Sequence, residues 1–123
     1  MTRFIAAVFA VAVCAFAAPP LPPVHAQSQN EMNATAAKDY ARADADLNRV
    51  YKKLAAHLDA TGATKLKRAQ RAWLTFRDAE MEFAADGARG GSLSPLLRYG
   101  AAARLTRERV KALTAYLTEY QSR

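Results

Sequence analysis

Two carboxylates one helical turn apart, Asp78 and Glu82, are the side chains that most resemble the paired acids of a catalytic site. They fall on the solvated face of a predicted helix, where no pocket is implied. Other catalytic groups are scarce: His57 is the only histidine expected in the mature chain, and we interpret it as a surface residue. No Gly-rich phosphate loop and no metal-ligand cluster is present. We therefore predict that the protein is not an enzyme and that it holds no cofactor or metal.

The stretch Lys67–Glu82, with the sequence KRAQRAWLTFRDAEME, is the second chemically unusual feature and holds the only tryptophan. At 100° per residue, Trp73 lies at the centre of a predicted inward face. The other residues of that face are Leu66, Ala69, Gln70, Phe76, Arg77, Glu80 and Ala84, with Phe83 at its edge. A buried Arg or Glu without a partner costs several kcal/mol. The rest of the chain must therefore supply partners, or leave this strip open to a ligand.

Charged residues on the inward faces of the predicted helices have signs that cancel. They are Asp44, Arg77, Glu80 and Arg109. We predict a network in which the two acids neutralise the two arginines, with Arg77 also stacked on Trp73. Two roles stay open for this network. It fixes the helix register only, or Arg77 is half neutralised and engages a carboxylate or phosphate of a partner.

Helical periodicity and helix-end signals divide the chain into three helices. Ser28 and Glu31 have the spacing of a capping box, so the first helix is expected to begin near Gln29. It carries Asn33 and Asp44 on its apolar face and ends before Gly62.

The second and third helices are separated by a glycine-rich loop. Thr64 is the expected cap of the second helix, which runs to about Asp86. Ser94 and Pro95 then open the third helix, which runs to about Tyr120. No segment shows period-two alternation, so the sequence predicts an all-α fold, a three-helix up-down-up bundle.

The N-terminal segment has the features of a signal peptide. Arg3 precedes an apolar run, prolines follow it, and Ala26 offers a cleavage site. We predict a signal peptide at 1–26, a single helical domain at 27–123, and a periplasmic or secreted location. A retained N-terminal anchor is the alternative, although the run is short for a bilayer span of ~20 residues. A lipoprotein at Cys14 is disfavoured because Val13 stands where a small residue is expected.

The chain is basic, with a formal net charge of +7 over 123 residues. An exported basic protein meets anionic partners such as phospholipid headgroups or acidic wall polymers, unless the charge serves solubility alone. Acids are interleaved with the bases, and no aromatic residues are placed for base stacking. We therefore predict no nucleic-acid binding.

The residues from Glu31 to Arg109 resemble a known family, the LprI-like lysozyme-inhibitor N-terminal domain. The resemblance is carried by Glu31-Met32-Asn33, Tyr40, Ala43-Asp44, Leu47-Asn48, Tyr51-Lys52-Lys53-Leu54, Ala69-Gln70-Arg71-Ala72-Trp73, Phe76-Arg77-Asp78-Ala79-Glu80, Gly90-Gly91-Ser92 and Leu105-Thr106-x-x-Arg109. It implies an exported helical domain without catalysis that binds and inhibits lysozyme.

The chain departs from that family in its cysteines. Relatives usually carry them near the start of the domain and at the positions of Thr35, Met81 and Ala101, whereas the predicted mature chain has none. We describe it as a cysteine-less variant. A bridge between positions 81 and 101 closes about 20 residues and contributes ~3 kcal/mol. Without it, we expect a more mobile loop after the second helix.

Two binding hypotheses follow. A lysozyme inhibitor presents a loop to the enzyme's cleft, and Arg89, Gly90, Gly91 and Ser92 form the natural candidate. Lysozymes are commonly basic, so repulsion opposes this docking unless an acidic patch of Asp78, Glu82 and Asp86 meets a basic rim. The alternative is a cell-envelope module that binds anionic polymer or lipid headgroups. Its residues are Lys52, Lys53, Lys65, Lys67, Arg68 and Arg71.

Overall fold

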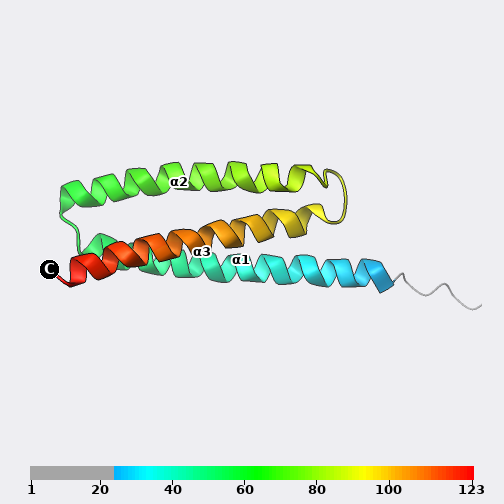
Figure 1. Cartoon of the computed structure of the whole chain (residues 1–123), viewed down its shortest axis with the longest axis horizontal. Helices are drawn as coiled ribbons and strands as arrows, with labels where there is room; N and C mark the ends of the chain where they lie inside the picture. The colour runs from blue at the N-terminus through cyan, green and yellow to red at the C-terminus, as the bar shows by residue number, and fades with distance from the viewer. Residues whose placement is uncertain (1–23) are drawn as a thin grey trace, which may run out of the picture.

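The computed structural model describes residues 24–123 as three long helices. They are α1 (Val24–Ala56), α2 (Ala60–Asp86) and α3 (Ser94–Gln121). Each helix reverses the direction of the one before it, so α1 and α3 run the same way (Figure 1). Residues 24–123 contain no strand, and the predicted all-α three-helix fold is confirmed. The predicted signal peptide lies outside the described residues apart from its last three positions.

Two helices begin earlier than predicted. α1 starts at Val24 rather than near Gln29, so the capping-box residues lie inside the helix. No proline or glycine stands between Val24 and Gln29 to break the helix. α2 is capped by Asp59 rather than Thr64, because the Gly62 N–H donates to the Asp59 carboxylate at 2.7 Å.

The connection between α1 and α2 is therefore tighter than expected. Gly62 does not end the first helix but lies in the first turn of α2. A Cβ there would come within 3.1 Å of the Asp59 carboxylate and 3.3 Å of Leu58. At the start of α3, Ser94 is the first helical residue rather than the cap, and Pro95 stands in the first turn as predicted.

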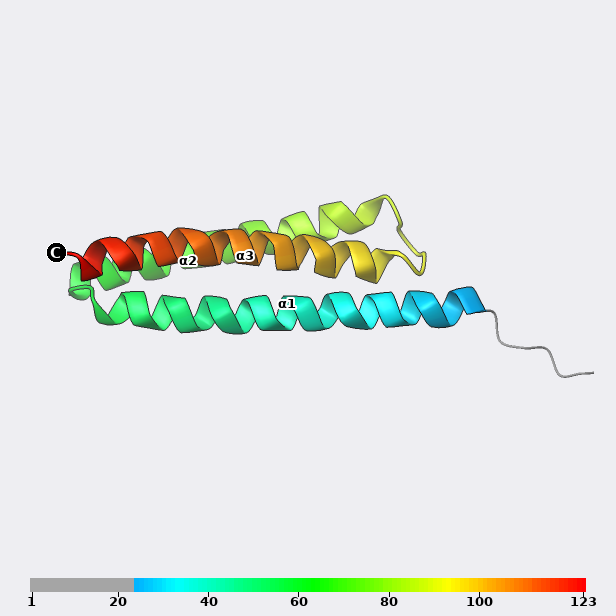
Figure 2. The same cartoon turned by 60° about the horizontal axis from the view of Figure 1, so that its bottom comes forward.

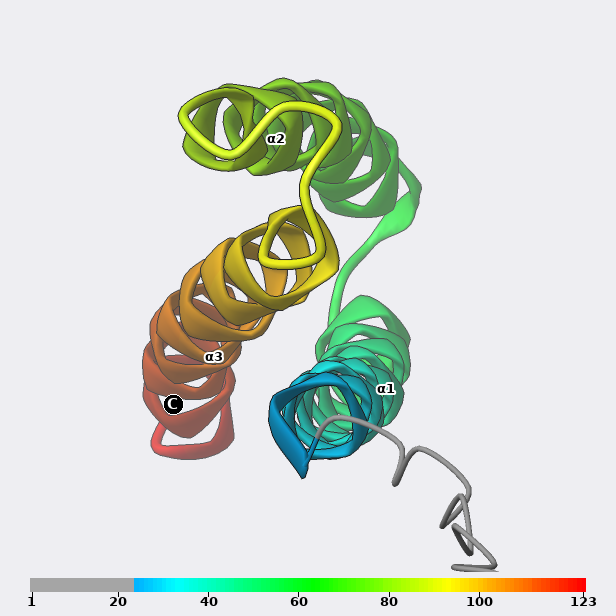
Figure 3. The same cartoon turned by 90° about the vertical axis from the view of Figure 1, so that its right-hand side faces the viewer.

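The bundle is open on one side. α3 packs along both neighbours, whereas α1 and α2 make few contacts with each other. In the end view, α3 lies between the other two helices near the 87–93 loop (Figure 3). α3 makes most of its contacts with α1, and Figure 2 shows α3 in front of α2, with α1 running along its length below. Contacts across the α1–α2 gap must therefore come from long side chains.

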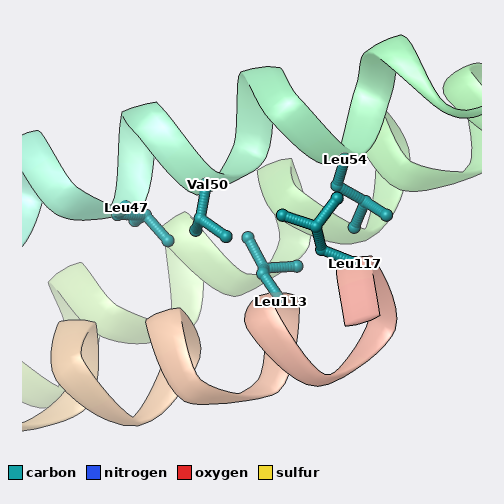
Figure 4. Packing of buried hydrophobic residues seen from close by; sticks show 5 residues of the cluster. All are labelled: Leu47, Val50, Leu54, Leu113 and Leu117. Atoms are coloured by element: carbon teal, nitrogen blue, oxygen red, sulfur yellow. The ribbon is translucent and has the colours of Figure 1, made fainter. Parts of the chain in front are cut away.

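A leucine-rich core fills the half of the bundle next to the α1–α2 turn. Five buried residues from α1 and α3 interlock there: Leu47, Val50, Leu54, Leu113 and Leu117 (Figure 4). Trp73 and Leu66 of α2 pack against this cluster. The half next to the 87–93 loop buries mainly small residues, namely Ala36, Ala43, Ala85, Ala102 and Ala103, together with Leu105.

The face predicted for α2 is rotated in the structure. Its buried residues are Gln70, Arg77 and Ala85. Phe76 is 50 % exposed and Ala69 is also exposed, so the prediction that they point inward is wrong, and Phe83, placed at the edge of the face, is 76 % exposed. The helix turns inward the two long polar side chains that find partners there. Because α2 is covered mainly from the side of α3, the phenylalanine side stays in solvent.

Candidate functional site

Arg77 is the polar centre of the molecule. Its side chain is only 9 % exposed, and its Nη1 donates to Asp44 of α1 at 3.2 Å. Nε and Nη2 lie 3.1 and 3.0 Å from Asp78, the next residue along α2. One buried guanidinium thus spans the gap between α1 and α2. With three nitrogens directed at acids and little exposure, Arg77 offers an external anion almost no access.

Aromatic rings enclose the same guanidinium. Its carbon lies 5.3 Å from the centre of the Tyr40 ring and 5.4 Å from that of Trp73, as expected for cation–π contacts. Tyr40 stacks in turn on Tyr99 of α3, with ring centres 6.1 Å apart. The stacking on Trp73 was predicted, whereas the two tyrosines were not. Their contacts join all three helices around one charge.

The other two members of the predicted network do not join it. Arg109 donates from Nε to Gln70 at 3.0 Å and lies over the Trp73 ring at 5.9 Å. Burial lowers the pKa of the Arg109 guanidinium from its ordinary value, opposed by the nearby Tyr116. Glu80 is half-buried and forms no ion pair within residues 24–123. Gln70 takes the place of the expected acid, because an amide oxygen can accept an arginine N–H without a charge.

The glycine-rich loop lies at the opposite end from the leucine core. Arg89, Gly90, Gly91 and Ser92 are all exposed. Gly90 has φ of 76°, a left-handed conformation that glycine adopts at low cost. Asn33 of α1 donates to the Ser92 carbonyl at 3.0 Å and ties the loop to the bundle. In the sequence, the position of Asn33 on the mainly apolar face of the first helix is the feature that could have indicated such an anchor.

Each carboxylate of the predicted acidic patch contacts an arginine. Asp78 is held by Arg77, as described above. Glu82 accepts two hydrogen bonds from Arg98 of α3, at 2.9 and 3.0 Å. Asp86 accepts from Arg89 at 2.5 Å. The patch is exposed, but its charge is locally compensated.

A groove between α1 and α3 opens beside the loop, and no pattern in the sequence predicts it. Its volume is about 550 Å³. It is lined by Ser28, Glu31, Met32, Thr35, Ala36, Asp39, Leu96, Gly100, Ala103 and Arg107. Met32 on its rim and Leu93 in the loop are 43 % and 42 % exposed. The loop end therefore combines apolar surface with acids and arginines.

The basic residues predicted to bind polymer gather at the other end, on α1 and α2. They are Lys52, Lys53, Lys65, Lys67, Arg68 and Arg71, and all six are exposed. Unlike the acids of the loop end, none of them forms an ion pair within residues 24–123. Lys67 and Arg71 border a groove of about 230 Å³ between α1 and α2.

No cluster of three or more His, Cys, Asp or Glu is placed to hold a metal within residues 24–123. Of the helices in this range, none has the length and hydrophobicity needed to cross a bilayer.

Fold and site together define a small helical domain whose exposed loop and grooves suit it to binding. The sequence model of the family described as lysozyme inhibitor LprI matches residues 23–113. The chain belongs to this family.

A similar protein of Rhizobium meliloti (strain 1021), described as uncharacterized, is 43 % identical over 101 residues. The alignment covers 72 % of this chain and 73 % of that protein. No solved structure matches the chain. The description as cysteine-less needs correction, because the full chain contains Cys14, outside the described residues. Residues 24–123 contain no cysteine.

Proposed function

We propose that this protein is an exported, non-catalytic binding domain that inhibits a lysozyme by presenting residues 89–92 to the enzyme. The family match over most of the chain carries this proposal. The exposed loop supports it, because Asn33 holds one side of the loop against α1 and reduces the entropy lost on docking.

Arg89 is the contact that best fits such an enzyme. A lysozyme cleft carries two carboxyl groups on either side of the scissile bond. An arginine at the tip of an inserted loop is complementary to those acids, even though two basic proteins repel at long range. Arg89 now pairs with Asp86, and both side chains are exposed, so Arg89 can leave Asp86 for an acid of the enzyme at low cost. Met32 and Leu93 supply apolar contact beside it.

An inhibition assay with matched arginine variants tests this role. The processed protein should slow lysis of cell walls by at least one class of lysozyme at micromolar excess. Arg89→Ala should weaken inhibition about tenfold or more, because it removes a charge-assisted contact. Arg49→Ala is the control, since Arg49 also pairs with an acid three residues earlier but lies on α1 away from the loop. Unchanged lysis rates with every lysozyme class would refute the proposal.

Binding to anionic polymer or lipid headgroups is the second candidate, and the unpaired basic end supports it. Six exposed bases without acid partners within residues 24–123 give this end of the bundle a positive charge, which favours a phosphate- or carboxylate-bearing polymer. Retention on anionic vesicles or wall polymer should fall steeply with added salt. Replacing Lys67 and Arg71 by glutamine should weaken retention, whereas Arg104→Gln on α3 should not. Retention that ignores salt would contradict this function.

Export to the periplasm or the medium is part of the proposal. N-terminal sequencing of the protein recovered from its host should give Gln27 as the first residue. Processing there removes the first turn of α1 as described, and leaves Ser28 and Glu31 in position to cap the new end. Recovery of the intact N-terminus from membranes would instead identify a retained anchor.

A further inference from the structure

An apolar seam runs along the solvent side of α2. It consists of Ala69, Ala72, Phe76, Ala79 and Phe83, spaced alternately three and four residues apart. All five are exposed, and the two phenylalanines are 50 % and 76 % exposed. Alternating steps of three and four are the repeat by which one helix packs along another. Nothing in residues 24–123 covers this seam, which we call the α2 seam.

Charges beside the α2 seam are segregated along the helix. At 100° per residue, Lys65 falls in line with the seam, and Arg68 falls along one border of it. The same border carries Glu82 and Asp86 towards the other end. All four residues are exposed. The first half of α2 is therefore basic next to the seam, and the second half is acidic.

We propose that two copies of this chain associate through their α2 seams, antiparallel, about a two-fold axis beside Phe76. In this arrangement, Phe76 meets its own counterpart, Ala72 faces Ala79, and each Phe83 covers the Ala69 of the other copy. Lys65 then lies near Asp86 of the second copy, and Arg68 lies near Glu82. Each contact therefore occurs twice, with the roles of the two copies exchanged, as a two-fold interface requires.

The charge pattern selects both the partner and the direction. Lys65 and Asp86 lie at nearly equal distances from Phe76 on opposite sides, so the helix is complementary to its own reversed copy. Parallel pairing would instead place Lys65 against Lys65 and Asp86 against Asp86, which is repulsive. The antiparallel arrangement also opposes the two helix dipoles favourably.

The intramolecular ion pairs of α2 are compatible with this contact. Glu82 already accepts from Arg98, and Asp86 accepts from Arg89. A carboxylate offers about four lone-pair sites, so each acid can take a second donor. The glycine loop follows the end of α2 (Figure 1), so the loops of two antiparallel copies would point in opposite directions. Both loops therefore stay free for the proposed lysozyme contact, on which this association does not depend.

The expected dimer is weak. From their exposed fractions, Phe76 and Phe83 of both copies together expose on the order of 500 Å² of surface that the dimer could bury. The alanines and the stems of the flanking bases bring the contact towards the ~1,000 Å² at which specific interfaces begin. Dimerisation should therefore depend on concentration in the micromolar range.

Sedimentation equilibrium of the processed protein tests the association. Wild type should pass from monomer to dimer as its concentration rises. Phe76→Glu should weaken association at least tenfold, and thermal unfolding should show an intact fold because the ring is exposed. Met32→Glu is the control, since Met32 is 43 % exposed on α1, away from the seam. A wild-type protein that stays monomeric throughout, or a Phe76→Glu variant that associates as before, would overturn the proposal.

Charge reversal and cross-linking test the direction. Lys65→Glu should weaken association several-fold, and adding Asp86→Lys to the same chain should restore it. Mixing Ala72→Cys and Ala79→Cys chains should yield a disulfide-linked pair under mild oxidation. Ala72→Cys chains alone should cross-link poorly. Efficient cross-linking of Ala72→Cys to itself, or no rescue by the double reversal, would overturn the antiparallel arrangement.

Discussion

The two halves of the bundle are stabilised by different kinds of contact. Next to the α1–α2 turn, leucines from α1 and α3 form a dry core around Leu113, which is fully buried. Next to the 87–93 loop, the buried residues are mostly alanines, with Leu105 and Thr106, and Arg77 joins α1 to α2 through Asp44. Apolar packing therefore holds one half, and directional polar contacts hold the other.

The difference shows how the helices are aligned. Leucine packing is non-directional and tolerates small shifts of one helix along another. A guanidinium between two rings and two acids has few satisfactory positions, so it fixes the register of α2 relative to α1. Those two helices otherwise touch little. The leucine half should thus contribute most of the stability, and the polar half most of the alignment.

Leu113→Ala should produce the largest effect on stability. Removing a fully buried leucine from a packed cluster typically costs 2–5 kcal/mol, and we expect about 3 kcal/mol here. Urea unfolding measures the loss. Leu93→Ala makes the same deletion at a residue that is 42 % exposed, in the other half, and should cost under ~1 kcal/mol. Equal losses at the two sites would contradict the proposed division of roles.

Arg77→Ala should have the next largest effect, about 2 kcal/mol. This is below the ~3–5 kcal/mol for breaking a fully buried ion pair, because Asp44 and Asp78 are 41 % and 64 % exposed and regain water. A double-mutant cycle with Asp44→Ala should show a coupling of about 1 kcal/mol. Arg71→Ala, at an exposed arginine of the same helix, should change stability by under ~0.5 kcal/mol.

Thr106→Val should stabilise the protein. The Thr106 hydroxyl is fully buried and has no hydrogen-bond partner in the described part of the chain. Replacing it by a methyl group of similar size removes the desolvation cost, for a gain of about 1 kcal/mol, or a Tm several degrees higher. Thr114→Val is the control, since that hydroxyl is exposed and donates to the Val110 carbonyl. A lower Tm for Thr106→Val would indicate an internal water at this site.

Asn33→Ala should have a small global effect and a clear local one. The variant loses one exposed hydrogen bond to the Ser92 carbonyl, which contributes about 0.5–1 kcal/mol. Amide hydrogen exchange at residues 89–93 should accelerate, because the loop loses its tie to α1. Asn48→Ala removes a comparable exposed bond, to Asp44, away from the loop. Equal exchange in the two variants would show that the loop is held by other contacts.

Periodicity was sufficient to predict the helices but not the faces they bury. The three helices, the all-α class and the end of α2 at Asp86 were predicted from residue spacing alone. The wheel of α2 places Trp73 at the centre of the buried face, because large apolar side chains are usually buried. The structure buries Arg77 as predicted and packs Trp73 against the leucine core, but it exposes Phe76, because the open bundle covers α2 from one side only.

The candidate site was predictable in its chemistry more than in its pairings. Helical wheels of α1 and α2 place Asp44 and Arg77 on inward faces. The structure brings the two side chains together as an ion pair. Gln70 as the partner of Arg109 does not follow, because the charge pattern favoured an acid. The groove beside the loop could not be predicted either, since it depends on how α1 and α3 are spaced.

The pH dependence of stability tests the smallest of these effects, which comes from the Tyr40 phenol beside Arg77. Burial raises the pKa of Tyr40 above its ordinary value of 10.0, and the neighbouring Arg77 partly opposes this shift. The folded state therefore keeps the phenol proton at a pH where the unfolded chain has lost it. The stability that this provides is present below pH 10.0 and is lost as the pH rises through the folded-state pKa.

Tyr40→Phe removes this group and leaves the other titrating side chains in place. Unfolding free energies measured from about pH 9 to pH 11 should fall less steeply for the variant than for wild type. Absorbance titration of the folded wild type and variant should show that the phenol lost in Tyr40→Phe is one whose pKa lies above the ordinary value for tyrosine. Parallel stability curves would mean that water reaches the Tyr40 hydroxyl freely, and the half around Arg77 would then be less dry than its contacts indicate.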